Sequence, residues 1–257
     1  MNRINTLLQN KENILTIFYT AGYPNLEDTI PVLEQLQAVG ADMVEVGIPF
    51  SDPVADGPVI QQANLQAIDN GMTVVKLFEQ LEGMRKKVNI PVLIMSSLNP
   101  ILQYGMEKFC EACEHVGIDG LILPDLPVDV YESEYKALFE QHGIHNILLI
   151  TPTTPEARIE EIDAKSTGFI YQVSSSSITG AKGRFSEQQI AYFKKIKAMN
   201  LSTPNMIGFG ISDEKTFDQA CQYAKGGIIG SAFVKALNSG EGKDGIVKDF
   251  VQSVRSI

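Results

Sequence analysis

The sequence predicts an α/β protein, a (β/α)8 TIM barrel in which residues 1–257 form a single domain. Two observations predict this fold. Eight short apolar runs, often rich in β-branched residues, alternate with stretches whose apolar residues recur at helical spacing. The alternation fills the chain, and no linker, low-complexity tract or change in composition divides it. Eight buried strands with helices between them, in about 250 residues, are typical of a closed parallel barrel.

Each expected strand is a buried run of three to seven residues. In chain order the runs are Ile14–Thr20, Met43–Val46, Val92–Met95, Gly120–Leu123, Asn146–Ile150, Phe169–Val173, Asn205–Gly208 and Gly227–Ile229. The expected helices are Leu26–Val39, Val74–Arg85, Met106–His115, Tyr131–His142, Glu187–Met199, Asp213–Tyr223 and Ala232–Leu237. A further helical stretch, Ile4–Leu8, precedes the first strand, and we expect this N-terminal capping helix to cover the bottom of the barrel.

Composition excludes several classes of function. The net charge of −10 argues against nucleic acid or an anionic membrane as a partner. Three cysteines do not make a disulfide framework, and Cys110 and Cys113, although spaced as CxxC, lie one helical turn apart without a second ligand pair. We therefore expect neither a metal site nor a redox site. Because no apolar run is long enough to span a membrane and the N-terminus lacks a signal-peptide core, we expect a cytoplasmic protein.

The segment Glu45–Pro58 is the most informative part of the chain. It starts at the end of the second expected strand and places three carboxylates in a loop that Pro49, Pro53 and Pro58 stiffen. A rigid loop can hold a carboxylate at a set position, as acid–base chemistry requires. A charged surface turn is the simpler explanation for a single acidic residue. Three acids in a proline-rich loop at a strand end favour a catalytic role.

Glycine-rich segments follow the last three strands. They are Ser174–Gly180, Gly208–Ser212 and the pair Gly230-Ser231, which precedes a helical run. Glycine lets the backbone approach an anion, and a helix N-terminus presents unpaired N–H groups. Barrel enzymes often bind phosphate after strands seven and eight. We therefore predict a phosphate site built from backbone donors.

Elimination narrows the chemistry. A Schiff-base aldolase needs a lysine at a strand end, and none of the expected strand ends carries one. A metal aldolase needs clustered ligands, but His115, His142 and His145 fall in helices or before a strand, at the bottom or outer face. We expect proton transfers on a phosphorylated substrate, without cofactor or metal. If the reaction breaks a carbon–carbon bond, the substrate must supply its own electron sink. The carboxylates expected on the catalytic face are Glu45, Asp52, Asp56 and Asp125.

With these residues in view, the chain resembles the tryptophan synthase alpha chain family along essentially its whole length. The segment Glu45–Pro58, EVGIPFSDPVADGP, is similar to the identifying motif of that family in order and spacing. Supporting matches are Pro152–Pro155, Ile178–Gly180, Gly208–Ser212 and Gly230–Ala232.

The resemblance implies cleavage of indole-3-glycerol phosphate to indole and glyceraldehyde 3-phosphate. It implies that Glu45 is the general acid–base group and that Asp56 holds and polarises the indole N–H. It also implies ring contacts from Phe18 and Tyr171. The phosphate site that it implies consists of Gly180, Gly210, Gly230 and Ser231.

The resemblance further implies a partner, the tryptophan synthase beta chain, in an αββα assembly. Loops after strands two and three would face it, with Asp52, Pro53, Asn99 and Pro100 as expected contacts. Family members commonly carry Tyr-Tyr or a similar pair before that Asn-Pro, where this chain has Met95–Leu98. We expect Asp125 to support a loop rather than to act chemically.

The long Ser- and Gly-rich segment Ser174–Phe185 is expected to form a lid over the substrate, with Thr179, Lys182 and Arg184 in it. Two alternatives stay open from the residues. The phosphate site alone fits another phosphosugar isomerase or epimerase barrel, and an alpha-like subunit that activates a beta chain without turnover is also conceivable. Release of indole from indole-3-glycerol phosphate distinguishes them.

Overall fold

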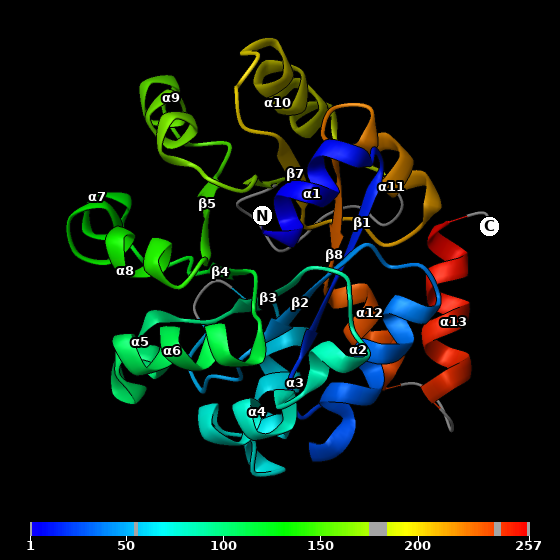
Figure 1. Ribbon diagram of the computed structural model, residues 1–257. Helices are drawn as coiled ribbons and strands as arrows, with labels where there is room; N and C mark the ends of the chain where they lie inside the picture. The colour runs from blue at the N-terminus through cyan, green and yellow to red at the C-terminus, as the bar shows by residue number, and fades with distance from the viewer. Residues whose placement is uncertain (1, 54–55, 175–183, 239–242, 256–257) are drawn as a thin grey trace.

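Eight parallel strands close into a barrel in the computed structural model, which describes residues 2–53, 56–174, 184–238 and 243–255 (Figure 1). Each strand pairs with the next along the chain, and β8 pairs with β1. The predicted fold is therefore confirmed. The strands are β1 (Ile14–Thr20), β2 (Met43–Gly47), β3 (Val92–Met95), β4 (Gly120–Ile122), β5 (His145–Ile150), β6 (Ile170–Val173), β7 (Asn205–Gly208) and β8 (Gly226–Ile229).

Helices surround the barrel (Figure 1). They are α1 (Arg3–Asn10), α2 (Thr29–Ala38), α3 (Pro58–Asp69), α4 (Val74–Leu81), α5 (Leu98–Tyr104), α6 (Met106–Val116), α7 (Val128–Val130), α8 (Lys136–Gln141), α9 (Glu156–Lys165), α10 (Glu187–Ala198), α11 (Glu214–Cys221), α12 (Ser231–Leu237) and α13 (Lys243–Val254). The sequence analysis missed α3, α5, α7, α9 and α13. Two expected helices are interrupted. The first stops at Leu81, because Gly83 adopts a left-handed φ of 71°. The second contains a π-helical turn at Tyr131–Tyr135.

Alternation along the strands decides which side chains enter the barrel. On β2, Met43 belongs to the interior cluster, whereas Val44 and Val46 pack in the layer between strands and helices. Glu45 has the parity of Met43 and therefore points into the barrel. The register places it directly opposite Phe18 of β1.

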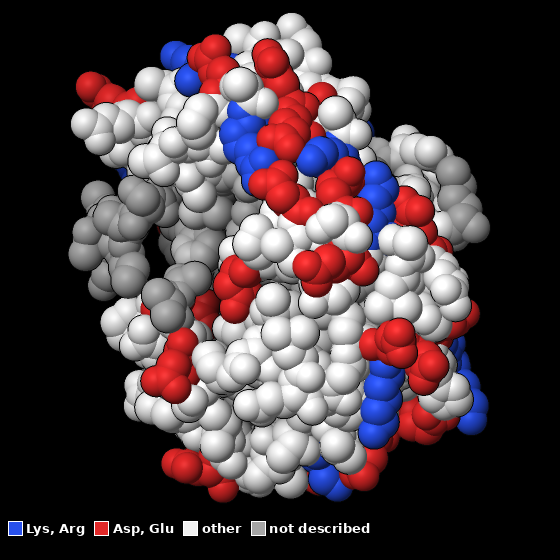
Figure 2. Space-filling model, turned by 90° about the vertical axis from the view of Figure 1, so that its left-hand side faces the viewer, with Lys and Arg blue, Asp and Glu red and all other residues white. Residues whose placement is uncertain are grey.

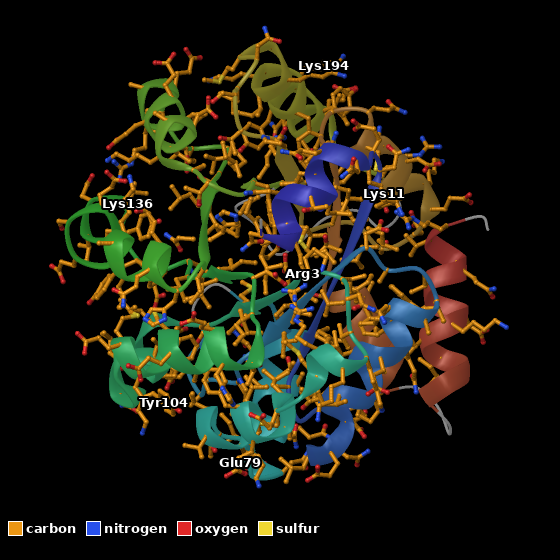
Figure 3. All side chains as sticks on the ribbon, viewed as in Figure 1. Arg3, Lys11, Glu79, Tyr104, Lys136 and Lys194 are labelled. Carbon is orange, nitrogen blue, oxygen red and sulfur yellow. The ribbon has the colours of Figure 1, made fainter. Side chains whose placement is uncertain are left out.

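The capping helix α1 covers the N-terminal end of the barrel, as predicted. Its residues Ile4 and Leu8 are buried in the same cluster as the inward side chains of the strands. Two basic residues, Arg3 at the start of α1 and Lys11 just after its end, are labelled in Figure 3. Both pair with buried carboxylates at the strand starts. Arg3 pairs with Asp119 at 3.0 Å, and Lys11 pairs with Asp42 at 2.5 Å.

Charged side chains gather in the upper part of the face that carries α7, α8 and α9, and a largely uncharged area lies below them (Figure 2). The ion pairs on these helices include Arg158 and Lys165 with Glu161, and Lys136 with Glu132. Within the described part of the chain, none of the helices combines the length and apolarity that crossing a bilayer requires.

Candidate active site

A cavity of about 350 Å³ opens at the carboxyl ends of the first four strands. This is the end at which barrel enzymes carry their catalytic residues. The predicted residues Phe18, Asp52, Pro53 and Asp56 are all part of its lining, together with Gly47 and Asn64. The loop after β2 therefore meets the end of β1 across a hollow large enough for a small ligand.

Glu45 is fully buried on β2, beside Phe18 in the strand pairing and two residues before Gly47 of the cavity lining. Neither of its carboxyl oxygens has a hydrogen-bond partner among the described residues. Desolvation disfavours the charged form of such a group and raises the pKa of Glu45 to about 8. An unpaired carboxyl at this depth contributes nothing evident to stability, which makes Glu45 a candidate for acid–base chemistry.

Asp56 lies in a more polar environment than Glu45. Burial raises its pKa to about 6, and a hydrogen bond from Asn64 opposes that shift. The Asn64 amide Nδ2 donates to the Asp56 carboxylate at 3.4 Å, and Asn64 Oδ1 accepts from the Thr20 hydroxyl at 3.3 Å. The sequence analysis missed Asn64 because it missed α3. The pair Gly57-Pro58, a common helix start, was the available signal.

Of the two predicted aromatic residues, Phe18 on β1 lines the cavity, and Tyr171 on β6 belongs to the interior cluster of the barrel. The Phe18 ring covers Gly47, where an added Cβ would lie 2.6 Å from Phe18 Cζ. The Tyr171 ring covers Gly208 in the same way, since a Cβ there would lie 2.2 Å from the Tyr171 hydroxyl. Burial raises the pKa of Tyr171 well above its usual value, and the charges of Glu45 and Asp56 add to the shift.

The predicted phosphate residues lie at the ends of β7 and β8. Gly210 adopts a positive φ of 78° in the turn after β7. Gly230 is the N-cap of α12, and Ser231 is its first residue. A Cβ on Gly230 would lie 3.3 Å from Phe18 Cδ1, so a side chain there would disturb the ring wall as well as an anion. Gly180 lies outside the described residues.

Of the residues expected in the lid, Thr179 and Lys182 also lie outside the described residues. Arg184 is exposed and lines a second hollow, of about 430 Å³, together with Phe185, Lys215 and Asp218. None of the four carboxylates expected on the catalytic face contributes to that hollow. Three of them, Asp52, Asp56 and Asp125, line the smaller cavity instead.

The residues predicted to face a partner lie near the cavity mouth. Asp52 is exposed, and Asn99 and Pro100 lie in the first turn of α5. Both carboxylate oxygens of Asp125 accept from the Leu98 N–H, at 2.9 and 3.0 Å. Asp125 therefore holds the start of α5, which agrees with the supporting role expected for it.

The remaining candidates for metal or redox chemistry lie elsewhere. Cys110 and Cys113 are buried free thiols on α6, and desolvation raises the pKa of both. His115 and His142 bond to glutamates on the helical layer, and His145 is the first residue of β5. Among the described residues there is no group of His, Cys, Asp and Glu arranged to hold a metal ion.

Comparison with known proteins gives a consistent result. The family model for the tryptophan synthase alpha chain matches residues 4–256. The alpha chain of Christiangramia forsetii is 54% identical over 257 residues, 100% of both chains. That of Flavobacterium johnsoniae is 54% identical over 256 residues, 99% of this chain and 100% of its own.

Solved structures agree. The alpha subunit from Legionella pneumophila superimposes with a TM-score of 0.88 at 32% identity, covering 100% of this chain and 98% of its own. Tryptophan synthase from Mycobacterium tuberculosis superimposes with a TM-score of 0.86 at 27% identity, covering 99% of this chain and 98% of that chain. With its barrel, its buried glutamate and a family match over nearly its full length, the chain belongs to the tryptophan synthase alpha chain family.

Proposed function

We propose that Glu45 and Asp56 carry the acid–base chemistry of the lyase reaction of this family, cleavage of indole-3-glycerol phosphate to indole and glyceraldehyde 3-phosphate. The observation that supports this most is the unpartnered, fully buried carboxyl of Glu45 at the end of β2. An isomerase or epimerase barrel is disfavoured because the family match covers residues 4–256.

The environments of the two carboxyls suggest different roles. With a pKa of about 8, Glu45 is largely protonated at neutral pH and can act as an acid. With a pKa of about 6, Asp56 is largely ionised and can accept a hydrogen bond from the indole N–H. Pairs of titratable groups whose pKa values are pushed apart in this way commonly divide acid and base work.

The reaction then proceeds in two proton transfers. Glu45 donates its proton to C3 of the indole ring, which leaves a cationic ring that Asp56 stabilises through the ring N–H. The Glu45 carboxylate takes the proton of the hydroxyl next to the bond that breaks. The electron pair of that carbon–carbon bond returns to the ring, so indole and an aldehyde form and Glu45 is protonated again. The protonated ring is the electron sink, so the sequence of steps needs neither lysine nor metal.

The indole ring and the phosphate of the substrate would each contact residues of suitable chemistry. Phe18 and Tyr171 provide apolar walls for the indole ring. The turn at Gly210 and the start of α12 at Gly230 and Ser231 would bind the phosphate through backbone N–H groups and the serine hydroxyl. Because the chain carries a net charge of −10, local donors rather than the global field must attract the anionic substrate.

The test is the variant Glu45→Gln, which keeps the shape of the side chain and removes the transferable proton. We expect indole release to fall by ~10²–10⁴-fold, the usual contribution of a general acid–base group. Glycerol 3-phosphate should still bind, as calorimetry would report. Turnover above a tenth of wild type would show that Glu45 does not have this role.

We also propose that the chain acts in the cytoplasm within an αββα assembly with the beta chain. Indole is small and apolar, so direct transfer to the next enzyme limits its loss, and the cavity mouth with Asp52, Pro53, Asn99 and Pro100 is the docking surface. Mixing the chain with its cognate beta chain should give a heterotetramer by mass and faster indole release. A monomer without activation would contradict this assembly.

A further inference from the structure

The turn after β7 has an unusual backbone at a place that the proposed phosphate site uses. Phe209 and Gly210 both adopt positive φ, 71° and 78°. Left-handed geometry is unfavourable for a residue with a side chain such as Phe209. It persists only where the surroundings hold it. The residues that hold this turn are the one that follows β6 and one from the first turn of α10.

Ser174 provides the first contact. It follows β6 directly and is fully buried. Its N–H donates to the Gly208 carbonyl at 3.0 Å, which extends the strand pairing by one residue. Its hydroxyl donates to the Phe209 carbonyl at 2.7 Å, beyond the end of the paired strands. The hydroxyl is therefore not needed for the sheet and acts on the turn alone.

Gln189 in the first turn of α10 orients that hydroxyl. Its amide Nε2 donates to Ser174 Oγ at 3.3 Å. Its Oε1 accepts from the Ser186 N–H at 2.9 Å, as part of the capping box of α10. Because Ser174 Oγ accepts from Gln189, its single hydrogen is directed to Phe209. We call Ser174, Gln189 and the Phe209 carbonyl the β7 clasp.

The peptide group converts this contact into an effect on ligand binding. The Phe209 C=O and the Gly210 N–H belong to one planar trans peptide, so they point in opposite directions. Fixing the carbonyl toward Ser174 thus fixes the direction of the Gly210 N–H. We propose that Ser174 and Gln189 are positioning residues that aim the Gly210 N–H at the substrate phosphate. This inference rests on the proposed function, which places the phosphate at Gly210.

The first test is Ser174→Ala, measured with two probes that report different parts of the site. Glycerol 3-phosphate should bind about 5–10-fold more weakly, the effect of misdirecting one hydrogen bond to a charged group. Indole, which has no phosphate, should bind as in wild type. In steady-state kinetics KM should rise while kcat changes little, because the clasp contacts neither carboxyl.

Matched variants separate the clasp from the helix cap. Ser186→Ala removes the cap hydroxyl that accepts from the Gln189 N–H, and leaves Ser174 and the Gln189 amide in place. It should lower the melting temperature without changing the affinity for glycerol 3-phosphate. Gln189→Met removes the donor to Ser174 and should weaken phosphate binding. The double variant with Ser174→Ala should be no weaker than Ser174→Ala alone, because both act through one hydroxyl.

Three results would overturn the inference. The first is folded Ser174→Ala with wild-type affinity for glycerol 3-phosphate. The second is an equal loss of indole and phosphate affinity, which would mean that the whole turn collapses. The third is a loss of glycerol 3-phosphate affinity in Ser186→Ala as large as that in Ser174→Ala, which would assign the effect to the start of α10. If the wild-type protein itself did not bind glycerol 3-phosphate, that result would contradict the phosphate site of the proposed function.

Discussion

At the scale of single residues, the carboxyl groups of Glu45 and Asp56 differ in pKa because their surroundings differ. Glu45 has no hydrogen-bond donor among the described residues, so its pKa is raised by desolvation alone. Asp56 has Asn64 beside it, and that amide favours the ionised form. Both effects can be measured by titration.

The first prediction concerns stability. The pKa of Glu45 is raised from 4.5 to about 8 by folding, so the folded protein holds a proton that the unfolded chain loses above pH 4.5. Stability is therefore lost as pH rises through this window. Glu45→Gln has no such penalty and should melt roughly 5–10 °C above wild type at pH 9, with no difference at pH 4. A difference independent of pH would contradict the buried, protonated state.

The second prediction concerns Asn64. Asn64→Ala removes the bond that lowers the pKa of Asp56, so the acid limb of the kcat/KM profile should move to higher pH. Since the bond is long, we expect a shift on the order of half a pH unit. Gln61→Ala is the control, because Gln61 donates to the Asp56 backbone carbonyl and not to the carboxylate. An unchanged acid limb in Asn64→Ala would show that this bond is not important.

At the scale of elements, loops after neighbouring strands hold each other in place. The helix α5 begins at Leu98 without a side-chain cap from its own N-cap residue, Ser97. Asp125, from the loop after β4, accepts from the Leu98 N–H instead. The cap thus links two loops on the catalytic face.

The third prediction follows from this link. Asp125→Ala should cost about 0.5–1 kcal/mol of unfolding free energy, as expected for an exposed N-cap, measured by urea denaturation. Ser97→Ala, the matched control at the N-cap itself, should change little, because the Ser97 side chain makes no capping bond. If the two variants were equally destabilised, Asp125 would not be the cap of α5.

At the scale of the whole molecule, two buried carboxylates fasten the strand starts at the end opposite the cavity. Asp42 accepts from the Leu15 N–H and pairs with Lys11 and Arg255. Asp119 likewise accepts from the Val92 N–H and pairs with Arg85 and Arg3. These clusters tie the two ends of the chain to the barrel.

The fourth prediction tests this arrangement. Asp119→Ala leaves the guanidinium of Arg85, whose side chain is only 17% exposed, without its carboxylate partner. The free energy of unfolding should fall by about 3–5 kcal/mol, because a buried charge that loses its partner is strongly destabilising. Denaturant unfolding measures the loss. The control is Glu79→Ala, which breaks an exposed ion pair with Lys76 (Figure 3). This variant should leave the free energy of unfolding unchanged. Similar losses in both variants would mean that burial is not the cause.

The sequence alone was sufficient for the barrel and for the order of its strands, because buried strands and amphipathic helices leave periodic patterns in the chain. It missed α3 and α5, which start at or near prolines next to functional loops, where turn signals mask the helical period. It also placed Glu45 at the end of the second strand and Asp56 in the loop that follows, since a strand end and prolines are local features.

Only the tertiary structure decided how those residues behave. The elevated pKa of Glu45 comes from its burial in the closed barrel, and Asn64 reaches Asp56 from a helix that the sequence analysis did not predict. The β7 clasp joins Ser174, Gln189 and Phe209 across three elements. Such contacts depend on distances between segments far apart in the chain, and desolvation depends on everything that surrounds a group. Neither quantity is encoded in a local pattern, so both appear only once the barrel has closed.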